Sequence, residues 1–239
     1  MANFTFNNKH NFDDMDCIIV NPIKIPVAKE NIEHETVEGR KGTLTIKTGT
    51  YHDIPIVIDL QLNYINEYET DYKEKIQAVS EWLCDIENNK LIFDDNTEKY
   101  YSVKSVEVGE FEDYKKFYSR FTVKFICEPF MQYVNENTIE ISNYGNVFNC
   151  GSVETEPYIE LQLPSEVQNI QITINDKTFQ LKNVKNYAYI DSNLLMCRNE
   201  EGNIRTAGEF PVLKKGNNTI TWTGNINKFL IKNNLKFRS

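Results

Sequence analysis

Apolar and polar residues alternate with a period of two along two segments in the first half of the chain. One segment contains Ile56, Ile58, Leu60 and Leu62, and the other contains Phe121, Val123, Phe125 and Cys127. Successive side chains of a β-strand point to opposite faces of its sheet, so this alternation is typical of strands with one buried face. A shorter alternation, Leu44 and Ile46, follows the turn sequence Gly39-Arg40-Lys41-Gly42 and predicts a further strand.

One segment between these strands has the periodicity of a helix. Its apolar residues recur at spacings of four, three, four and three, at Tyr72, Ile76, Val79, Leu83 and Ile86. Residues with this spacing share one face of an α-helix. Asp71 stands where an N-cap is expected, with Glu74 three residues later. We therefore expect one helix that docks its apolar face on a sheet.

The pattern changes after the strand that ends at Glu128-Pro129-Phe130. The second half contains no helical periodicity but many short apolar runs separated by turn sequences, such as Asn175-Asp176-Lys177 and Gly216-Asn217-Asn218. Short strands at this spacing predict a sandwich of two sheets. We expect two domains, residues 1–133 and 134–239, although a single large β domain also fits the length of 239 residues.

Charge divides the chain at the same place. Residues 1–133 contain 15 Lys and Arg against 24 Asp and Glu, a formal net charge of −9, and residues 134–239 contain 11 of each. The sequence pI of about 5.0 disfavours a dedicated nucleic-acid reader, which ordinarily presents a basic surface. The five cysteines are widely spaced, odd in number and never in a Cys-x-x-Cys pair, as expected of reduced thiols.

The sequence shows neither a run of about 20 apolar residues nor a secretory signal, so we expect no membrane insertion and synthesis in a cytosol. Catalytic motifs are also missing from the pattern. His10, His34 and His52 lack metal-ligand spacing, and the second half has no histidine with which to build a Ser-His-Asp site. We expect no catalytic residues, no metal site and no cofactor. Asp191 is expected to cap the turn that contains Ser192.

Several short motifs, in this order, resemble those of the distal tail proteins of long-tailed bacteriophages and related phage-tail-like particles. In the first half they are the Gly39-to-Leu44 turn and strand, the helix with Trp82-Leu83, and the strand from Phe121 to Pro129-Phe130. In the second half they are Asn143-Tyr144-Gly145-Asn146, Glu156-Pro157-Tyr158-Ile159, Tyr189-Ile190-Asp191-Ser192, Gly208-Glu209-Phe210-Pro211 and the Gly216-to-Gly224 segment. Each motif is weak alone, but their joint order spans almost the whole chain.

This resemblance implies an N-terminal ring-forming domain, β-sandwich or barrel-like with one packed helix, and a C-terminal galectin-like β-sandwich. It implies a homo-hexamer at the virion tail tip, made in the bacterial host cytoplasm, which joins the tail tube protein to hub, fibre or receptor-binding proteins. The implied role is structural and not enzymatic. A galectin-like fold does not by itself carry sugar binding.

Two features of the residues agree with a ring. An acidic first domain suits a channel through which DNA passes without sticking, so we expect an acidic lumen. The extended segment Val37 to Asp53 suits pairing with a neighbouring subunit's sheet, which is a form of β-augmentation. The candidate interface residues are Arg40, Lys41, Leu44, Ile46, Tyr51 and Ile54.

Two other functions stay open from the sequence. The alternative hypothesis is a carbohydrate-binding adhesion module that acts through the second domain, with Tyr187, Tyr189 and Trp222 as candidate contacts for glycans. Aromatic residues on strands more often belong to the core, which is where we place Trp222. A cell-wall hydrolase fits less well, because no nucleophile-base pair, metal motif or distinctive pair of acids is present.

Overall fold

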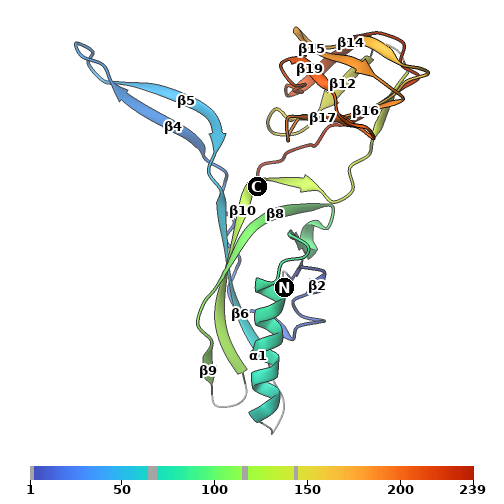
Figure 1. The fold of residues 1–239 in the computed structure, drawn as a ribbon. Coiled ribbons are helices and arrows are strands. Elements are labelled where there is room, and N and C mark those ends of the chain that lie inside the picture. Colours follow the sequence, from blue (N-terminus) through green and yellow to red (C-terminus); the bar gives the residue numbers. More distant parts are fainter. Residues whose placement is uncertain (1–2, 64–68, 115–117, 143–144) are drawn as a thin grey trace. The chain divides into compact units, whose positions relative to one another are not determined.

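The computed structural model describes residues 3–63, 69–114, 118–142 and 145–239. The chain divides into two compact units (Figure 1). The first comprises Met1–Val134 together with Arg238–Ser239, and the second comprises Asn135–Phe237. Both units are built mainly from β-strands, so the mainly-β fold class predicted from the sequence is confirmed.

The first unit is one large sheet with a helix and a separate hairpin. Its elements are β1 (Phe4–Phe6), β2 (Lys9–His10), β3 (Cys17–Ile19), β4 (Glu30–Thr36), β5 (Thr43–Tyr51), β6 (Ile54–Asn63), α1 (Glu69–Cys84), β7 (Lys90–Phe93), the 3-10 helix η1 (Asp94–Asn96), β8 (Lys99–Val108), β9 (Glu112–Tyr114) and β10 (Tyr118–Tyr133). Eight of these strands form one antiparallel sheet in the order β2-β1-β7-β8-β10-β6-β3, with β9 also paired to β10. Strands β4 and β5 pair with each other as a two-stranded sheet.

The core of the first unit lies on one face of the large sheet. Strands β6 and β10 pair in continuous register from Ile54–Cys127 to Asn63–Tyr118. Along both strands every second residue is buried, which confirms the strands predicted from the period-two patterns. Phe125 on β10 meets the rings of Phe4 and Phe6 edge-on, with ring centroids 5.8 and 5.0 Å apart.

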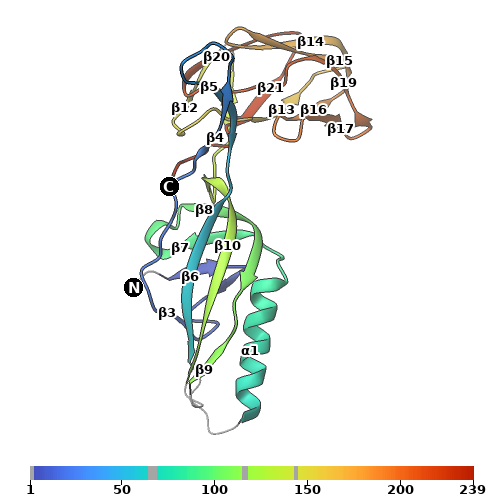
Figure 2. The same ribbon diagram turned by 90° about the vertical axis from the view of Figure 1, so that its left-hand side faces the viewer.

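Helix α1 runs alongside one face of this sheet (Figures 1 and 2). The ring of Trp82 stacks on Phe4 with centroids 5.9 Å apart, and its indole N–H donates a hydrogen bond to the carbonyl of Phe6 at 2.7 Å. The predicted docking of the helix is therefore correct. The predicted N-cap at Asp71 is wrong, because the backbone is already helical at Glu69.

The second unit is a sandwich of two antiparallel sheets. Its strands are β11 (Ile139–Ile141), β12 (Gly145–Asn149), β13 (Tyr158–Gln162), β14 (Val167–Ile174), β15 (Lys177–Val184), β16 (Tyr187–Asp191), β17 (Met196–Asn199), β18 (Gly202–Asn203), β19 (Arg205–Gly208), β20 (Gly216–Thr223) and β21 (Lys228–Lys232). The six-stranded sheet has the order β11-β21-β13-β16-β17-β18, and the five-stranded sheet has the order β12-β20-β14-β15-β19. One cluster of buried apolar side chains from both sheets forms the core.

Glu136 ties the beginning of the second unit to its end. Both oxygens of its carboxylate accept the backbone N–H of Leu235, at 3.2 and 3.3 Å. Burial raises the pKa of the Glu136 carboxyl above its ordinary value, although the hydrogen bonds and Lys232 oppose the shift. A carboxyl whose pKa is raised on folding contributes stability that is present below its unfolded pKa and lost as the pH rises through its folded pKa.

The change Trp82→Phe tests how strongly α1 is fastened to the sheet. It removes the indole N–H and leaves the buried carbonyl of Phe6 without this donor, so we expect the free energy of unfolding to fall by about 1–3 kcal/mol. Denaturant unfolding followed by far-ultraviolet circular dichroism measures this change. Phe12→Leu, at an exposed position of the same unit, is the control. A loss no larger than that of the control would contradict the expected role of the bond.

The change Glu136→Gln removes the buried charge but keeps an oxygen that can accept the N–H of Leu235. We expect the melting temperature of the variant minus that of the unchanged protein to be more positive at pH 7 than at pH 4. The reason is that only the unchanged protein carries the buried charge at pH 7. Differential scanning calorimetry at both pH values measures the difference. Glu166→Gln, at an exposed site of the same unit, should show no such trend.

Candidate functional site

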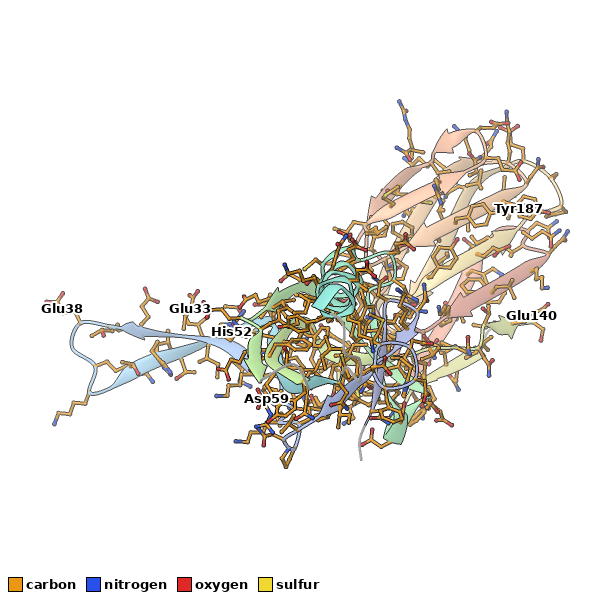
Figure 3. All side chains as sticks on the ribbon, turned by 90° about the horizontal axis from the view of Figure 1, so that it is seen from below. Glu33, Glu38, His52, Asp59, Glu140 and Tyr187 are labelled. Carbon is orange, nitrogen blue, oxygen red and sulfur yellow. The ribbon has the colours of Figure 1, made fainter. Side chains whose placement is uncertain are left out.

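Strands β4 and β5, with the turn between them, form a hairpin that we call the arm (residues 30–51). Within the described chain these strands pair only with each other, and almost every residue of both is exposed. Figure 3 shows Glu33 and Glu38 of the arm lying away from Asp59 on the large sheet of the same unit. An isolated two-stranded hairpin is only marginally stable in water, so the arm is the candidate contact surface of the first unit.

The turn of the arm depends on glycine. Gly39 and Gly42 adopt φ angles of +82° and +106°, in the left-handed region that other residues rarely occupy. A Cβ at either glycine would meet no atom within 4 Å, so the requirement comes from the backbone and not from crowding. The sequence pattern of a glycine turn is therefore confirmed as the tip of a hairpin.

The two faces of the arm differ in character. On one face the register places Glu33 opposite Ile46 and Glu35 opposite Leu44. Leu44 and Ile46 are 37% and 38% exposed, so their aliphatic side chains are only partly covered by the neighbouring strand. The other face carries His34 opposite Thr45. Ile32, opposite Lys47 on this second face, is 45% exposed. Each face of the arm therefore offers aliphatic surface, with two neighbouring side chains, Leu44 and Ile46, on the first face and Ile32 on the second.

The base of the arm is fastened to its own unit. The ring of Tyr51 meets Phe130 edge-on, with centroids 4.8 Å apart. A guanidinium nitrogen of Arg238 donates to the hydroxyl of Tyr51 at 3.1 Å, and the Ser239 hydroxyl donates to the carbonyl of Pro26 at 3.2 Å. The last two residues of the chain therefore return to the first unit and hold the arm where it begins.

The six interface residues predicted from the sequence lie in three different environments. Arg40, Lys41, Leu44 and Ile46 are exposed on the arm. Tyr51 is half-buried against Phe130 at the arm's base. Ile54 is only 2% exposed and belongs to the core of its own sheet, because it falls in the buried phase of the alternation along β6.

The face of the large sheet that points away from its core is polar. Near its centre the carboxylate of Asp59 accepts hydrogen bonds from Asn21 (2.8 Å) and Thr122 (2.7 Å), and these bonds lower the pKa of Asp59. They lie beside a hollow of about 530 Å³ whose lining includes Glu110, Glu112 and Arg120. The central charges of this face are Asp59, Glu107, Glu110, Glu112, Lys24, Arg120 and Lys124.

The three residues predicted to contact glycans do not lie on one surface. Tyr187 and Tyr189 lie on the outer face of the six-stranded sheet, because Ala188 and Ile190 between and beside them are core residues. Their rings are parallel, with centroids 6.3 Å apart. Trp222 on β20 instead stacks on the buried Phe229, with centroids 4.8 Å apart. Its assignment to the core side is supported by this contact.

A strained apolar turn joins β16 to β17. The backbone N–H of Leu194 donates to the Asp191 carboxylate at 3.0 Å, which is the turn capping expected from the sequence. Leu194 and Leu195 are 62% and 66% exposed. Leu195 has a φ angle of +53°, whereas every other described non-glycine residue with positive φ is Asn or Asp. Leucine is costly in this conformation, so the turn presents an exposed apolar side chain at the expense of stability.

Three of the five thiols are buried, whereas Cys84 and Cys150 are exposed. Cys17, Cys127 and Cys197 are buried, and burial raises the pKa of each thiol to about 12. His10 lies beside Asp13 and Asp94 at 3.0 and 3.3 Å. The search of the described residues found no group of three His, Cys, Asp or Glu side chains that could hold a metal ion. Nor is any helix of that part of the chain long and apolar enough to cross a membrane.

Comparisons with known proteins agree with this architecture. Residues 15–127, which lie within the first unit, match the family model of the phage tail protein RIFT-related domain. The whole chain is similar to the crystal structure of the Dit protein of SPP1, which is described as a paradigm of the hub adsorption apparatus in phages that infect Gram-positive bacteria. The TM-score is 0.70 at 14% sequence identity, covering 100% of this chain and 99% of that chain. No curated protein matches the sequence.

The chain over its whole length has the fold of the SPP1 Dit protein. Residues 15–127 match the phage tail protein RIFT-related family, so the two comparisons point to the same class of fold. The resemblance to the distal tail proteins drawn from the sequence is thereby confirmed.

The change Leu195→Asn tests the strain in the apolar turn. Asparagine tolerates the left-handed conformation, so we expect the free energy of unfolding of the second unit to rise by about 1 kcal/mol. Urea unfolding measures the gain. Leu194→Asn, at a neighbouring exposed position without a positive φ angle, is the matched control and should bring no gain. Equal effects of both changes would show that the gain does not come from the backbone of Leu195.

Proposed function

We propose that this chain is a structural hub of a phage tail tip that assembles into a homo-hexameric ring. The ring joins the tail tube protein to the tail-associated tip protein and to receptor-binding or fibre proteins. The chain is made in the cytoplasm of the bacterial host and has no catalytic role. The fold over the whole chain supports this proposal, as does its family match over residues 15–127.

The arm is the observation that carries the proposal. Among the described residues, each strand of the arm has one edge without a hydrogen-bonded neighbour. The face of Leu44 and Ile46 also has partly exposed aliphatic side chains. A partner can therefore gain both backbone hydrogen bonds and apolar contacts. A strand of a second subunit that pairs with such an edge satisfies both at once. Equivalent subunits that bind head to tail in this way close into a ring when the rotation between them fits.

The proposed ring encloses a channel for DNA, and its lining depends on which surface faces inward. The centre of the polar sheet face carries four acids and three bases among the residues described, so this face favours a weakly acidic lining. The acidic lumen expected from the sequence therefore requires a contribution from other segments of the first unit, such as α1, where acidic residues outnumber basic ones. Either lining avoids the basic surface that would hold DNA in place.

The paired change Leu44→Asp with Ile46→Asp tests the arm as the interface. We expect the unchanged protein to approach six times 27.9 kDa with rising concentration, and the variant to remain at the mass of one chain. The physical reason is that a carboxylate buried at each apolar contact costs several kcal/mol, and a ring repeats that cost at each interface. Light scattering coupled to size exclusion measures both masses.

Thr45→Asp is the matched control, because Thr45 lies between the two positions but on the opposite face of the arm. It should leave the assembly unchanged. A hexamer that persists in the Leu44→Asp, Ile46→Asp variant would exclude this face of the arm as the interface. A protein that stays monomeric at every concentration would contradict assembly of the ring by this chain alone.

A further inference from the structure

The outer face of the six-stranded sheet in the second unit gathers aromatic rings and charged groups. Register places Tyr158 on β13 between Asp191 on β16 and Lys232 on β21. The next outward position, Glu160, lies between Tyr189 and Leu230. Figure 3 shows Tyr187 and Glu140 on strands of this sheet, with Glu140 on the edge strand β11. Four strands thus bring their outward side chains to one surface.

This surface is hollowed. A hollow of about 360 Å³ is lined by Thr138, Tyr158, Glu160, Asp191, Leu230, Lys232 and Asn234. Its volume is at the lower end of the range of sites that hold small molecules, roughly 300–1,000 Å³. All of its lining residues belong to the second unit. The hollow is therefore a feature of one folded body, beside the stacked pair Tyr187 and Tyr189.

Three charged side chains around the hollow have no direct polar partner, although Lys232 acts at longer range on Glu136. Glu160, Arg198 and Lys232 make no ion pair or hydrogen bond through their side chains within the described chain. The Asp191 carboxylate accepts one bond, from the backbone of Leu194. Burial, followed by the negative charge of Glu160, raises the pKa of both Tyr158 and Tyr189, so the carboxylate lies close to the two phenols.

The balance of these charges indicates what kind of ligand fits. Three acids, Glu160, Asp191 and Glu200, are opposed by two bases, Lys232 and Arg198, so the charge is nearly balanced and the surface disfavours an anion. It does offer charged acceptors and charged donors side by side, together with the flat faces of tyrosine rings. A neutral molecule with many hydroxyl groups and an apolar C–H face matches both properties, because its hydroxyls exchange hydrogen bonds and its C–H face covers a ring.

We propose that the outer face of the six-stranded sheet binds a neutral saccharide, with Tyr158 and Tyr189 stacking against the sugar ring and Glu160, Asp191 and Lys232 holding its hydroxyl groups. This function goes beyond the hub role. It relocates the carbohydrate-binding hypothesis of the sequence analysis from Trp222, which packs against Phe229, to residues on β13 and β21.

The experiment uses saturation-transfer nuclear magnetic resonance on the full chain. The probes are the methyl glycosides of glucose, galactose, N-acetylglucosamine and N-acetylgalactosamine, and glycerol phosphate serves as the anionic comparison. We expect transfer to at least one neutral glycoside at millimolar concentration. We expect Tyr189→Ala and Glu160→Gln each to weaken binding at least tenfold, since each removes one of the two kinds of contact.

Two matched controls keep the test specific. Gln180→Ala lies on the outer face of the opposite, five-stranded sheet, and Glu166→Gln repeats the acid-to-amide change at an exposed site away from the hollow. Neither should alter binding. Glu160→Gln is nearly isosteric with the natural residue, so it remains informative even if Tyr189→Ala fails to fold.

Three outcomes would overturn the proposal. They are no transfer to any neutral glycoside, transfer that persists unchanged in both hollow variants, and transfer to glycerol phosphate alone. The arm variant Leu44→Asp with Ile46→Asp separates this test from that of the ring. It should bind the glycoside like the unchanged protein, because the two surfaces belong to different units.

Discussion

The pairing of β10 with β6 is the constraint on which the first unit depends. It runs without a register shift from Tyr118–Asn63 to Cys127–Ile54. A slip of one residue would turn Phe121, Val123 and Phe125 toward solvent and bring Arg120 and Lys124 into the core. The pairing also sets the direction of the arm, because His52 and Asp53 alone separate β5 from β6. Fixing β6 in the sheet therefore fixes where the arm leaves it.

Local patterns in the sequence were enough to find β6, β10 and α1, the elements on which this unit is built. The alternation along β6 and β10 and the four-three spacing along α1 both report the burial of one face, which is a local property. The same rules are weaker at element ends: an N-cap at Asp71 would start the helix at Tyr72, but the helix begins three residues earlier, at Glu69. They also placed Ile54 among contact residues, although it continues the buried series Ile56, Ile58 and Leu60 and should have been assigned to the core.

What the sequence could not show is which distant residues meet. The base of the arm joins Tyr51 to Arg238, which are 187 positions apart. The hollow of the second unit joins Tyr158, Asp191 and Lys232 through the pairing of three strands whose order differs from their order in the chain. Tyr158 and Glu160 carried a faint signal, because an aromatic and an acid at consecutive outward positions of a strand do not serve a core. Only the strand order shows that these two residues lie beside Asp191, Lys232 and Tyr189 on one surface.

The charge of the arm argues for a choice between its two free edges. Strand β4 contains Glu30, Glu33 and Glu35 within seven residues, whereas β5 contains Lys47 as the single charged residue among its nine. Proteins commonly place charges on strands that must not pair with other chains. In the proposed ring, the edge of β5 is therefore the one suited to a neighbouring subunit, and the acids of β4 discourage pairing on the other side. Growth from one edge gives each subunit one donor and one acceptor surface, which is what a closed ring of equivalent subunits requires.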